Sequence, residues 1–234
     1  MRRLIIVVVV VLVLLLGADR IALVAAERGV AVTLQDAQKL KNRPEVSIGG
    51  FPLLTQALRG RYDQVDTTFT DLQGGDGLTI DRLDVHLSGV HLPLSSLLNQ
   101  SVTQLPVDEA SATGTVSYAS LNAAAAQRIT LPGLTVKFSQ GTKGHIKISG
   151  TYSGFISAQL DGEAEISVRG RSLVVAPTED SLAQVPSVIR GRLIALLGDS
   201  YELPPLPFGF TPDKVTVAPT GVTLKASASD VVLK

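Results

Sequence analysis

Cysteine and tryptophan are both absent from this chain, and aromatic residues make up only 4% of its 234 residues. Without cysteine the protein has no disulfide, no thiol nucleophile and no cysteine metal site, so its own hydrophobic core must hold it together. Basic and acidic residues number 21 each, and the sequence has no basic stripe with interleaved aromatic residues. We therefore predict that nucleic acid is not a partner.

Motifs of the common enzyme classes are also missing. The chain has no G-x-S-x-G elbow, no P-loop, no G-x-G-x-x-G and no H-E-x-x-H. The segment from Asp71 to Gly77 resembles a calcium loop only faintly, because it lacks alternating acidic positions and a distal glutamate. His86 and His91 are five residues apart on a predicted strand, which places them on opposite faces unless Gly89 introduces a bulge. We predict no catalytic residue, no metal site and no cofactor.

One pair of acidic residues keeps an enzymatic alternative open. Asp63 and Asp66 follow Gly60-Arg-Tyr, where a carboxylate pair of a hydrolase or glycan-modifying enzyme is conceivable. Nothing in the sequence sets the separation of the two carboxylates or a contrast in their acidity, and two-carboxylate chemistry needs both. We therefore prefer a non-enzymatic function.

Residues 4–16, LIIVVVVVLVLLL, form an uninterrupted aliphatic run. Two arginines precede the run, and Asp19 and Arg20 follow it, which is the pattern of a secretory signal or an N-terminal anchor. The run is shorter than the roughly 20 residues of a usual membrane-spanning helix. We predict that residues 1–18 are a signal peptide or N-terminal membrane anchor. The body is then exported to the outer face of the cytoplasmic membrane or the periplasmic space.

A long helix is predicted over residues 19–43, ending before Pro44. Its spacing places five residues on one face: Leu23, Ala26, Val30, Leu34 and Ala37. Val24 and Ala26 permit signal cleavage after Ala26, but that cut removes the start of this helix. We therefore favour an uncleaved or early-cleaved leader.

From residue 62 onward apolar and polar residues alternate, and glycine-containing turns separate the segments. This pattern predicts a meandering antiparallel sheet with a bulge near Asp81. The later strands are predicted over 134–138, 145–149, 155–160, 163–169, 172–176, 214–218 and 222–226. Short helices are predicted over 52–59, 118–127 and 186–197. We expect residues 19–234 to form a single α+β domain. It keeps 19 of the 21 basic and all 21 acidic residues, for a net charge of −2.

Three segments carry more aliphatic surface than the few aromatic side chains can cover: 51–58, 186–197 and 204–210. Two interpretations stay open. These segments either cover one sheet face in an ordinary core, or they leave an incompletely filled apolar cavity sized for acyl chains. Such a cavity binds without catalytic residues, because burial of each methylene contributes about 0.8 kcal/mol.

The stretch Ile48-Gly-Gly-Phe-Pro-Leu-Leu-Thr-Gln-Ala-Leu-Arg-Gly-Arg-Tyr-Asp-Gln-Val65 resembles the G-F-P-(F/L)-L-T-Q…G-R-Y-(D/E)-x-V motif of the LmeA-like (lipomannan elongation) phospholipid-binding proteins of the actinobacterial envelope. Three later stretches resemble the same family in order. They are Val90-His-Leu-Pro-Leu-Ser-Ser-Leu-Leu98, Gly114-Thr-Val-Ser-Tyr-Ala-Ser-Leu121, and Leu206-Pro-Phe-Gly-Phe210 with Val215 and Gly221-Val-Thr-Leu224. The likeness covers nearly the whole body.

The resemblance implies a strongly curved antiparallel sheet wrapped around the long N-terminal helix, similar to the tubular lipid-binding (TULIP, BPI-like) proteins. It also implies a pocket for a phospholipid or another diacyl lipid, and a role at the membrane that supports lipomannan maturation in some members. The resulting hypothesis is a non-enzymatic lipid-binding or lipid-transfer protein of the cell envelope. The alternative is a scaffolding partner of membrane glycosyltransferases that carries no lipid.

Candidate residues follow from this hypothesis. The predicted acyl-chain contacts are Phe51, Leu54, Leu58, Ile189, Leu193, Leu196, Leu197, Phe208 and Phe210. Arginines beside these segments are candidates for the lipid phosphate, because guanidinium and phosphate form charge-assisted hydrogen bonds. They are Arg59, Arg61, Arg190 and Arg192.

Overall fold

The computed structural model describes residues 1–74, 77–93, 95–96, 104–129, 131–142, 144–154, 157–178, 191 and 200–233. The chain divides into two compact units. Unit 1 comprises Met1–Phe69, Asp84–Ser111 and Ala228–Lys234, and unit 2 comprises Thr70–Leu83 and Ala112–Ser227. The division falls inside strands rather than between elements, and the single domain over 19–234 stays a prediction.

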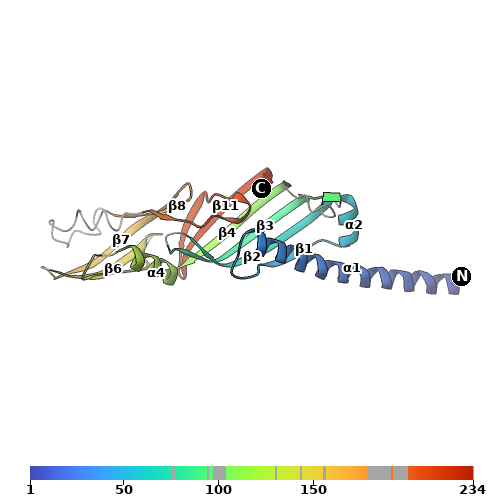
Figure 1. Cartoon of the computed structure of the whole chain (residues 1–234), viewed down its shortest axis with the longest axis horizontal. Coiled ribbons are helices and arrows are strands. Elements are labelled where there is room, and N and C mark those ends of the chain that lie inside the picture. The colour runs from blue at the N-terminus through green and yellow to red at the C-terminus, as the bar shows by residue number, and fades with distance from the viewer. Residues whose placement is uncertain are drawn as a thin grey trace. The chain divides into compact units, whose positions relative to one another are not determined.

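The predicted leader and the predicted 19–43 helix are one continuous helix, α1 (Arg2–Ala37), which carries the N-terminus in Figure 1. Leu23, Ala26, Val30 and Leu34 are half-buried as predicted. Ala37 is exposed, because the helix ends there and does not continue to Pro44.

A Schellman motif stops α1 early. The Leu40 N–H donates to the Gln35 carbonyl at 2.9 Å, and the Lys39 N–H donates to the Asp36 carbonyl at 3.3 Å. Lys39 adopts the left-handed conformation that this motif requires, with φ 52°. The predicted boundary at Pro44 was therefore wrong by several residues, since a lysine rather than a glycine occupies the left-handed position.

Three polar side chains on the docked side of α1 hold later segments of unit 1. An Asp19 carboxylate oxygen accepts a hydrogen bond from the Leu54 N–H at 2.9 Å. Glu27 accepts from the Ile48 N–H at 3.0 Å, and Gln35 accepts from the Arg43 guanidinium at 3.4 Å. Residues 19–37 of α1 thus belong to the folded body.

Eleven described strands form two sheets. The first has the order β1-β2-β3-β4-β11-β10, and the second has the order β5-β6-β7-β8-β9. The strands of the first sheet are β1 (Glu45–Gly49), β2 (Arg61–Gln73), β3 (Thr79–His91), β4 (Leu105–Ser117), β10 (Lys214–Ala218) and β11 (Gly221–Leu233). The strands of the second are β5 (Leu134–Gln140), β6 (Ile146–Ser153), β7 (Ser157–Arg169), β8 (Ser172–Pro177) and β9 (Ser200–Glu202).

Unit 1 includes the short helix α2 (Leu53–Arg59), which ends at Gly60 in the left-handed conformation, as predicted. β1 pairs antiparallel with β2, so that Ile48 lies opposite Val65. Buried aliphatic and aromatic side chains from these strands, such as Tyr62, Phe69 and Leu87, form the core of the unit. Their burial follows from alternation along each strand.

Unit 2 contains the second sheet, in which every neighbouring pair of strands is antiparallel. The helix α4 (Tyr118–Arg128) packs on β5. There the Asn122 side chain bonds both main-chain groups of Phe138, as a neighbouring strand would. This side chain accepts from the Phe138 N–H at 2.6 Å and donates to the Phe138 carbonyl at 3.1 Å. A short 3-10 turn, η2 (Pro207–Gly209), lies between β9 and β10.

The predicted fold class is confirmed: the protein is α+β, with a long N-terminal helix, short helices and antiparallel sheets (Figure 1). The buried residues of β3 change phase between Ile80 and Leu83, which confirms the predicted irregularity near Asp81. The strands predicted over 155–160 and 163–169 are instead one strand, β7, because Gly162 pairs with Ile148 inside the ladder. The helix predicted over 186–197 lies outside the described residues.

Candidate functional site

An apolar pocket lies within unit 2, between strands and an irregular segment. We call its strand side the floor: Ile80, Leu83, Ala112, Gly114, Leu224, Lys225 and Ala226. We call residues 203–212 the cover segment, from which Leu206 and Pro212 line the pocket. The pocket is partly open to solvent, and its cavity measures about 10 Å³, which is about the room for one water molecule.

The cover segment is fixed mainly at its two ends. The Leu203 N–H donates to the Arg171 carbonyl at 2.9 Å, and just past the other end the Asp213 N–H donates to the Lys225 carbonyl at 2.9 Å. Four prolines lie in the segment, and proline has no N–H to donate. Burial of apolar side chains such as Leu203 and Phe210 also holds the cover segment in place.

Two predicted acyl-chain contacts belong to the cover segment. Phe210 is buried, and Phe208 is half-buried with a left-handed backbone, φ 60°. The small floor residues Ala112 and Gly114 were not predicted as site residues. They lie on one face of β4, and both are buried. Their small size was the available signal, because two successive small residues on one face of a strand leave volume unfilled.

The other described acyl-chain candidates lie on the surface of unit 1. Phe51, Leu54 and Leu58 are 54%, 39% and 79% exposed. On the opposite side of α2, Gln56 is buried. Its side chain donates to the Gly49 carbonyl at 3.1 Å and accepts from the Asp63 N–H at 2.8 Å. α2 therefore buries an amide and exposes leucines. The remaining candidates, Ile189, Leu193, Leu196 and Leu197, lie outside the described residues.

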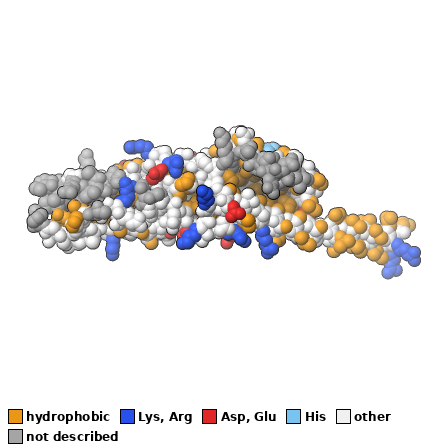
Figure 2. All heavy atoms as spheres, viewed as in Figure 1, with side chains coloured by type: hydrophobic (Ala, Val, Ile, Leu, Met, Phe, Trp, Pro, Cys, Tyr) orange, Lys and Arg blue, Asp and Glu red, His pale blue; other side chains and the backbone are white. Residues whose placement is uncertain are grey.

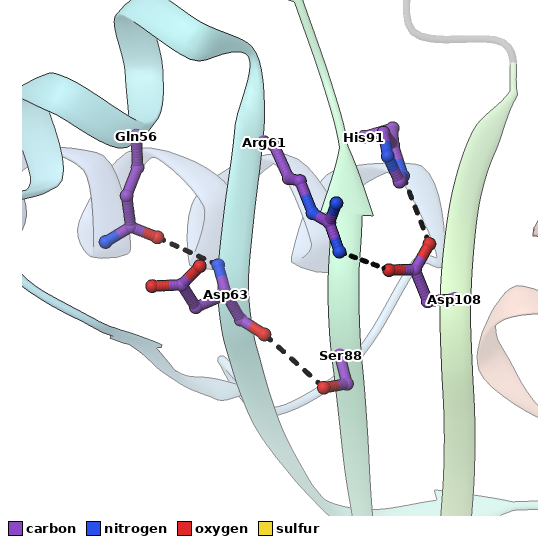
Figure 3. Close-up of polar contacts among 6 residues, drawn as sticks. All are labelled: Gln56, Arg61, Asp63, Ser88, His91 and Asp108. Carbon is purple, nitrogen blue, oxygen red and sulfur yellow. Dashed lines mark hydrogen bonds and ion pairs between the residues drawn. The ribbon is translucent and has the colours of Figure 1, made fainter.

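Among the arginine candidates, Arg61 already has an anionic partner. Its guanidinium donates to the Asp108 carboxylate at 2.6 Å, and the His91 ring nitrogen lies 3.6 Å from the other Asp108 oxygen (Figure 3). Gly89 leaves room for that carboxylate, since a Cβ there would lie 2.0 Å from Asp108 Oδ2. A phosphate must therefore compete with Asp108 for Arg61.

Arg59 lies exposed in the last turn of α2. Within the described part of the chain, no carboxylate pairs with it. Arg190 and Arg192 lie outside the described residues.

Comparison with known proteins bears on what these features bind. The family model described as LmeA-like phospholipid-binding matches residues 17–227. The chain belongs to the LmeA-like phospholipid-binding family. A comparison with curated proteins and another with solved structures found no match. Membership in the LmeA-like family agrees with the resemblance found in the sequence and indicates a lipid as the ligand class.

Three polar residues considered for other chemistry, His86, His91 and Asp66, have side-chain partners in this LmeA-like protein. A phase change at Gly89 brings both histidines of β3 to the outer face, where His86 pairs with Asp66 and His91 with Asp108. Asp66 also accepts from the Gln64 side chain at 2.6 Å. Within the residues that the structure describes, no group of three or more His, Cys, Asp and Glu side chains is arranged to hold a metal.

Proposed function

We propose that this protein is a non-enzymatic phospholipid-binding protein of the cell envelope that holds acyl chains between the floor and the cover segment of unit 2. The observation that carries the proposal is the family match over residues 17–227. The apolar lining of the pocket supports it, because floor and cover offer acyl chains an almost entirely hydrocarbon surface.

Lipid uptake requires the pocket to open. A cavity of about 10 Å³ is far below the roughly 300–1,000 Å³ of a usual ligand pocket. The cover segment is the element that can move without breaking a sheet, because its backbone bonds lie mainly at its ends. Acyl chains would replace Leu206 and Pro212 against the floor, so the floor would stay covered by hydrocarbon when the cover segment moves away.

We propose the predicted arginines as partners of the lipid phosphate. Lys225 adjoins the pocket, but it is exposed between the buried Leu224 and Ala226, so its side chain points to the other face of β11.

The location and biological role complete the proposal. α1 is long and apolar enough to cross a membrane, and its apolar part is near the N-terminus, where a signal sequence has the same character. We propose that the body lies at the outer face of the cytoplasmic membrane, and that it transfers lipid or supports lipomannan maturation. The family resemblance is the support for this finer role.

The first test is organic extraction of the purified full-length protein followed by mass spectrometry. We expect co-purified phospholipid, and uptake of a fluorescently labelled phospholipid by the extracted protein. A lipid-free protein that also fails to take up the labelled lipid would exclude the proposal. In that case co-purification of a membrane glycosyltransferase would support the scaffolding alternative.

A pocket variant tests the assigned site. A Cβ on Gly114 would lie 3.6 Å from Ile80 and from Leu83, which is ordinary contact, so Gly114→Ala fills the pocket without strain. Displacing one methylene of lipid should weaken affinity about fourfold, from about 0.8 kcal/mol per methylene. Thr113→Val is the matched control, because Thr113 is the preceding residue on β4 and points to the other face. Equal affinities of the two variants would place the acyl chains elsewhere.

A further inference from the structure

The start of α2 adjoins the end of the apolar run of α1. Leu4–Leu16 are 48–72% exposed, so this part of the helix has no protein covering it. Figure 2 shows it as a rod of hydrophobic side chains with basic side chains at its tip. Asp19 follows the run within three residues and accepts a hydrogen bond from the Leu54 N–H. This bond fixes α2 beside the end of the run.

The residues at this junction present apolar groups outward. Leu54 and Leu58 are exposed on one side of α2, while Leu53 and Gln56 are buried on the other, and Phe51, just before the helix, is also exposed. Ile21 on α1 is 74% exposed. Two exposed leucines beside a buried glutamine are unusual for a surface helix in water, and the exposed leucines suit a helix whose outer face meets hydrocarbon.

The apolar run of α1 is too short to cross a bilayer alone, which explains why a second apolar surface lies beside its end. The 15 residues from Leu4 to Ala18 span about 22 Å at about 1.5 Å per residue. The hydrocarbon core of a bilayer is about 30 Å thick, so the run is short by about 8 Å. Interfacial helices bury their apolar faces about 5–10 Å deep, which matches the shortfall.

The charges at the junction fit the lipid head groups. Asp19 is 3% exposed and hydrogen-bonded, so it does not present a free charge to the membrane. The Arg20 guanidinium lies 4.9 Å from the centroid of the Phe51 ring, and Arg59 is exposed at the other end of α2. Two arginines therefore border the apolar face at the level where phosphates lie.

From these observations we propose that Phe51, Leu54 and Leu58 form a membrane-contact surface that inserts into the outer leaflet beside the anchor. A bilayer is the occupant because it covers this surface and the adjoining run together. The inference rests on the proposed location at the membrane, and it is independent of lipid uptake by unit 2. It assigns these three residues to the bilayer rather than to a cavity.

The absence of tryptophan from the chain allows a direct test. Leu58→Trp in the full-length protein, reconstituted in vesicles of phosphatidylcholine and phosphatidylglycerol, gives a sample with a single tryptophan. Acyl chains brominated near the head group should quench most of its emission. Ala37→Trp is the control. Ala37 is exposed at the end of α1, about 27 Å beyond Asp19 at about 1.5 Å per residue, and so lies away from the proposed bilayer.

Equal quenching of the two tryptophans, or quenching of neither, would overturn the inference. So would a blue-shifted Leu58→Trp emission that brominated lipid does not quench, since a second copy of the chain would then cover the surface. Uptake of labelled phospholipid is measured on the same samples. Quenching by a protein that carries no co-purified lipid and takes up no labelled phospholipid would leave the membrane-contact surface standing while excluding the proposed function.

Discussion

The bond between Asp19 and the start of α2 makes a strong prediction about local stability. α2 begins after Pro52, which provides no side-chain cap, so the Leu54 N–H depends on Asp19 from α1. Asp19→Ala removes the acceptor. Loss of a helix cap costs about 0.5–2 kcal/mol, and loss of a negative charge at a helix N-terminus about 0.3–1 kcal/mol.

We take about 2 kcal/mol for the two effects together, because Asp19 is only 3% exposed and solvent screens it little. Amide hydrogen exchange of the full-length protein in nanodiscs measures the opening of α2 directly. The α2 amides should exchange about 30-fold faster in Asp19→Ala, since about 1.4 kcal/mol is a factor of ten. Asp19→Asn keeps an acceptor oxygen and loses the charge, so its α2 amides should exchange about twofold faster.

Glu27→Ala is the control on the same helix. Glu27 accepts from the Ile48 N–H on β1, so this variant should accelerate exchange of β1 and leave α2 unchanged. Equal exchange of α2 in the wild type and in Asp19→Ala would refute the reasoning. The same would follow if Asp19→Ala and Glu27→Ala accelerated α2 equally, because the effect would then come from general loosening of α1.

Four further predictions concern both units. Lys39→Gly should raise the free energy of unfolding by about 1 kcal/mol, because Lys39 has φ 52° and left-handed backbone is strained for residues with a Cβ; an unchanged or lower melting temperature would contradict this. Gly150→Ala should lower the free energy of unfolding by about 2 kcal/mol or more, because its Cβ would lie 2.0 Å from the Thr135 carbonyl oxygen on β5. Gly114→Ala is the control: its Cβ would make only ordinary contacts at 3.6 Å, so this variant should melt no earlier than the wild type. Arg61→Ala should change stability by less than about 1 kcal/mol, since Arg61 and Asp108 are 56% and 42% exposed, and the change should shrink in high salt; a larger loss would show that the pair is structural. Burial raises the pKa of Tyr62 and of Tyr118 above 10.0. Their contribution to the free energy of unfolding should therefore be full below pH 10.0 and fall as the pH rises through the folded pKa. Denaturation at a series of alkaline pH values should show this fall in stability, and the fall should be smaller in Tyr62→Phe.

Helices and strands were predictable from the sequence where the spacing of apolar residues follows the helical or strand period. The docked face of α1 follows from the spacing of Leu23, Ala26, Val30 and Leu34, and these residues are half-buried as expected. Asp19 and Glu27 lie on the same side, but their partners are backbone amides 35 and 21 residues later. No local sequence pattern predicts such a bond, because the donor belongs to a distant segment whose position is set only by the complete fold.

The candidate site was predictable only in part. Phe210 was found from the apolar stretch around it, and it is buried in the cover segment. α2 was found as a helix, but its orientation could not be predicted. Amphipathic reasoning assumes that leucine points inward, whereas hydrogen bonds to Gly49 and Asp63 hold Gln56 inside instead. The only signal of Gly114 is its small size on the same strand face as Ala112, and the prediction did not use it.

Under the proposed membrane location, the continuity of α1 limits how far a bound lipid would travel. With the leader in the bilayer, α1 would hold the body at one membrane. The body would then exchange lipid only with that leaflet and with the proteins within reach. A cut after Ala18 would release a body that keeps the bond between Asp19 and the start of α2, and this body would be free to carry lipid between membranes. A cut after Ala26 would release a body without that bond. The position of a single cleavage would thus decide whether the body stays at one membrane, moves between membranes, or loses a bond that stabilises α2.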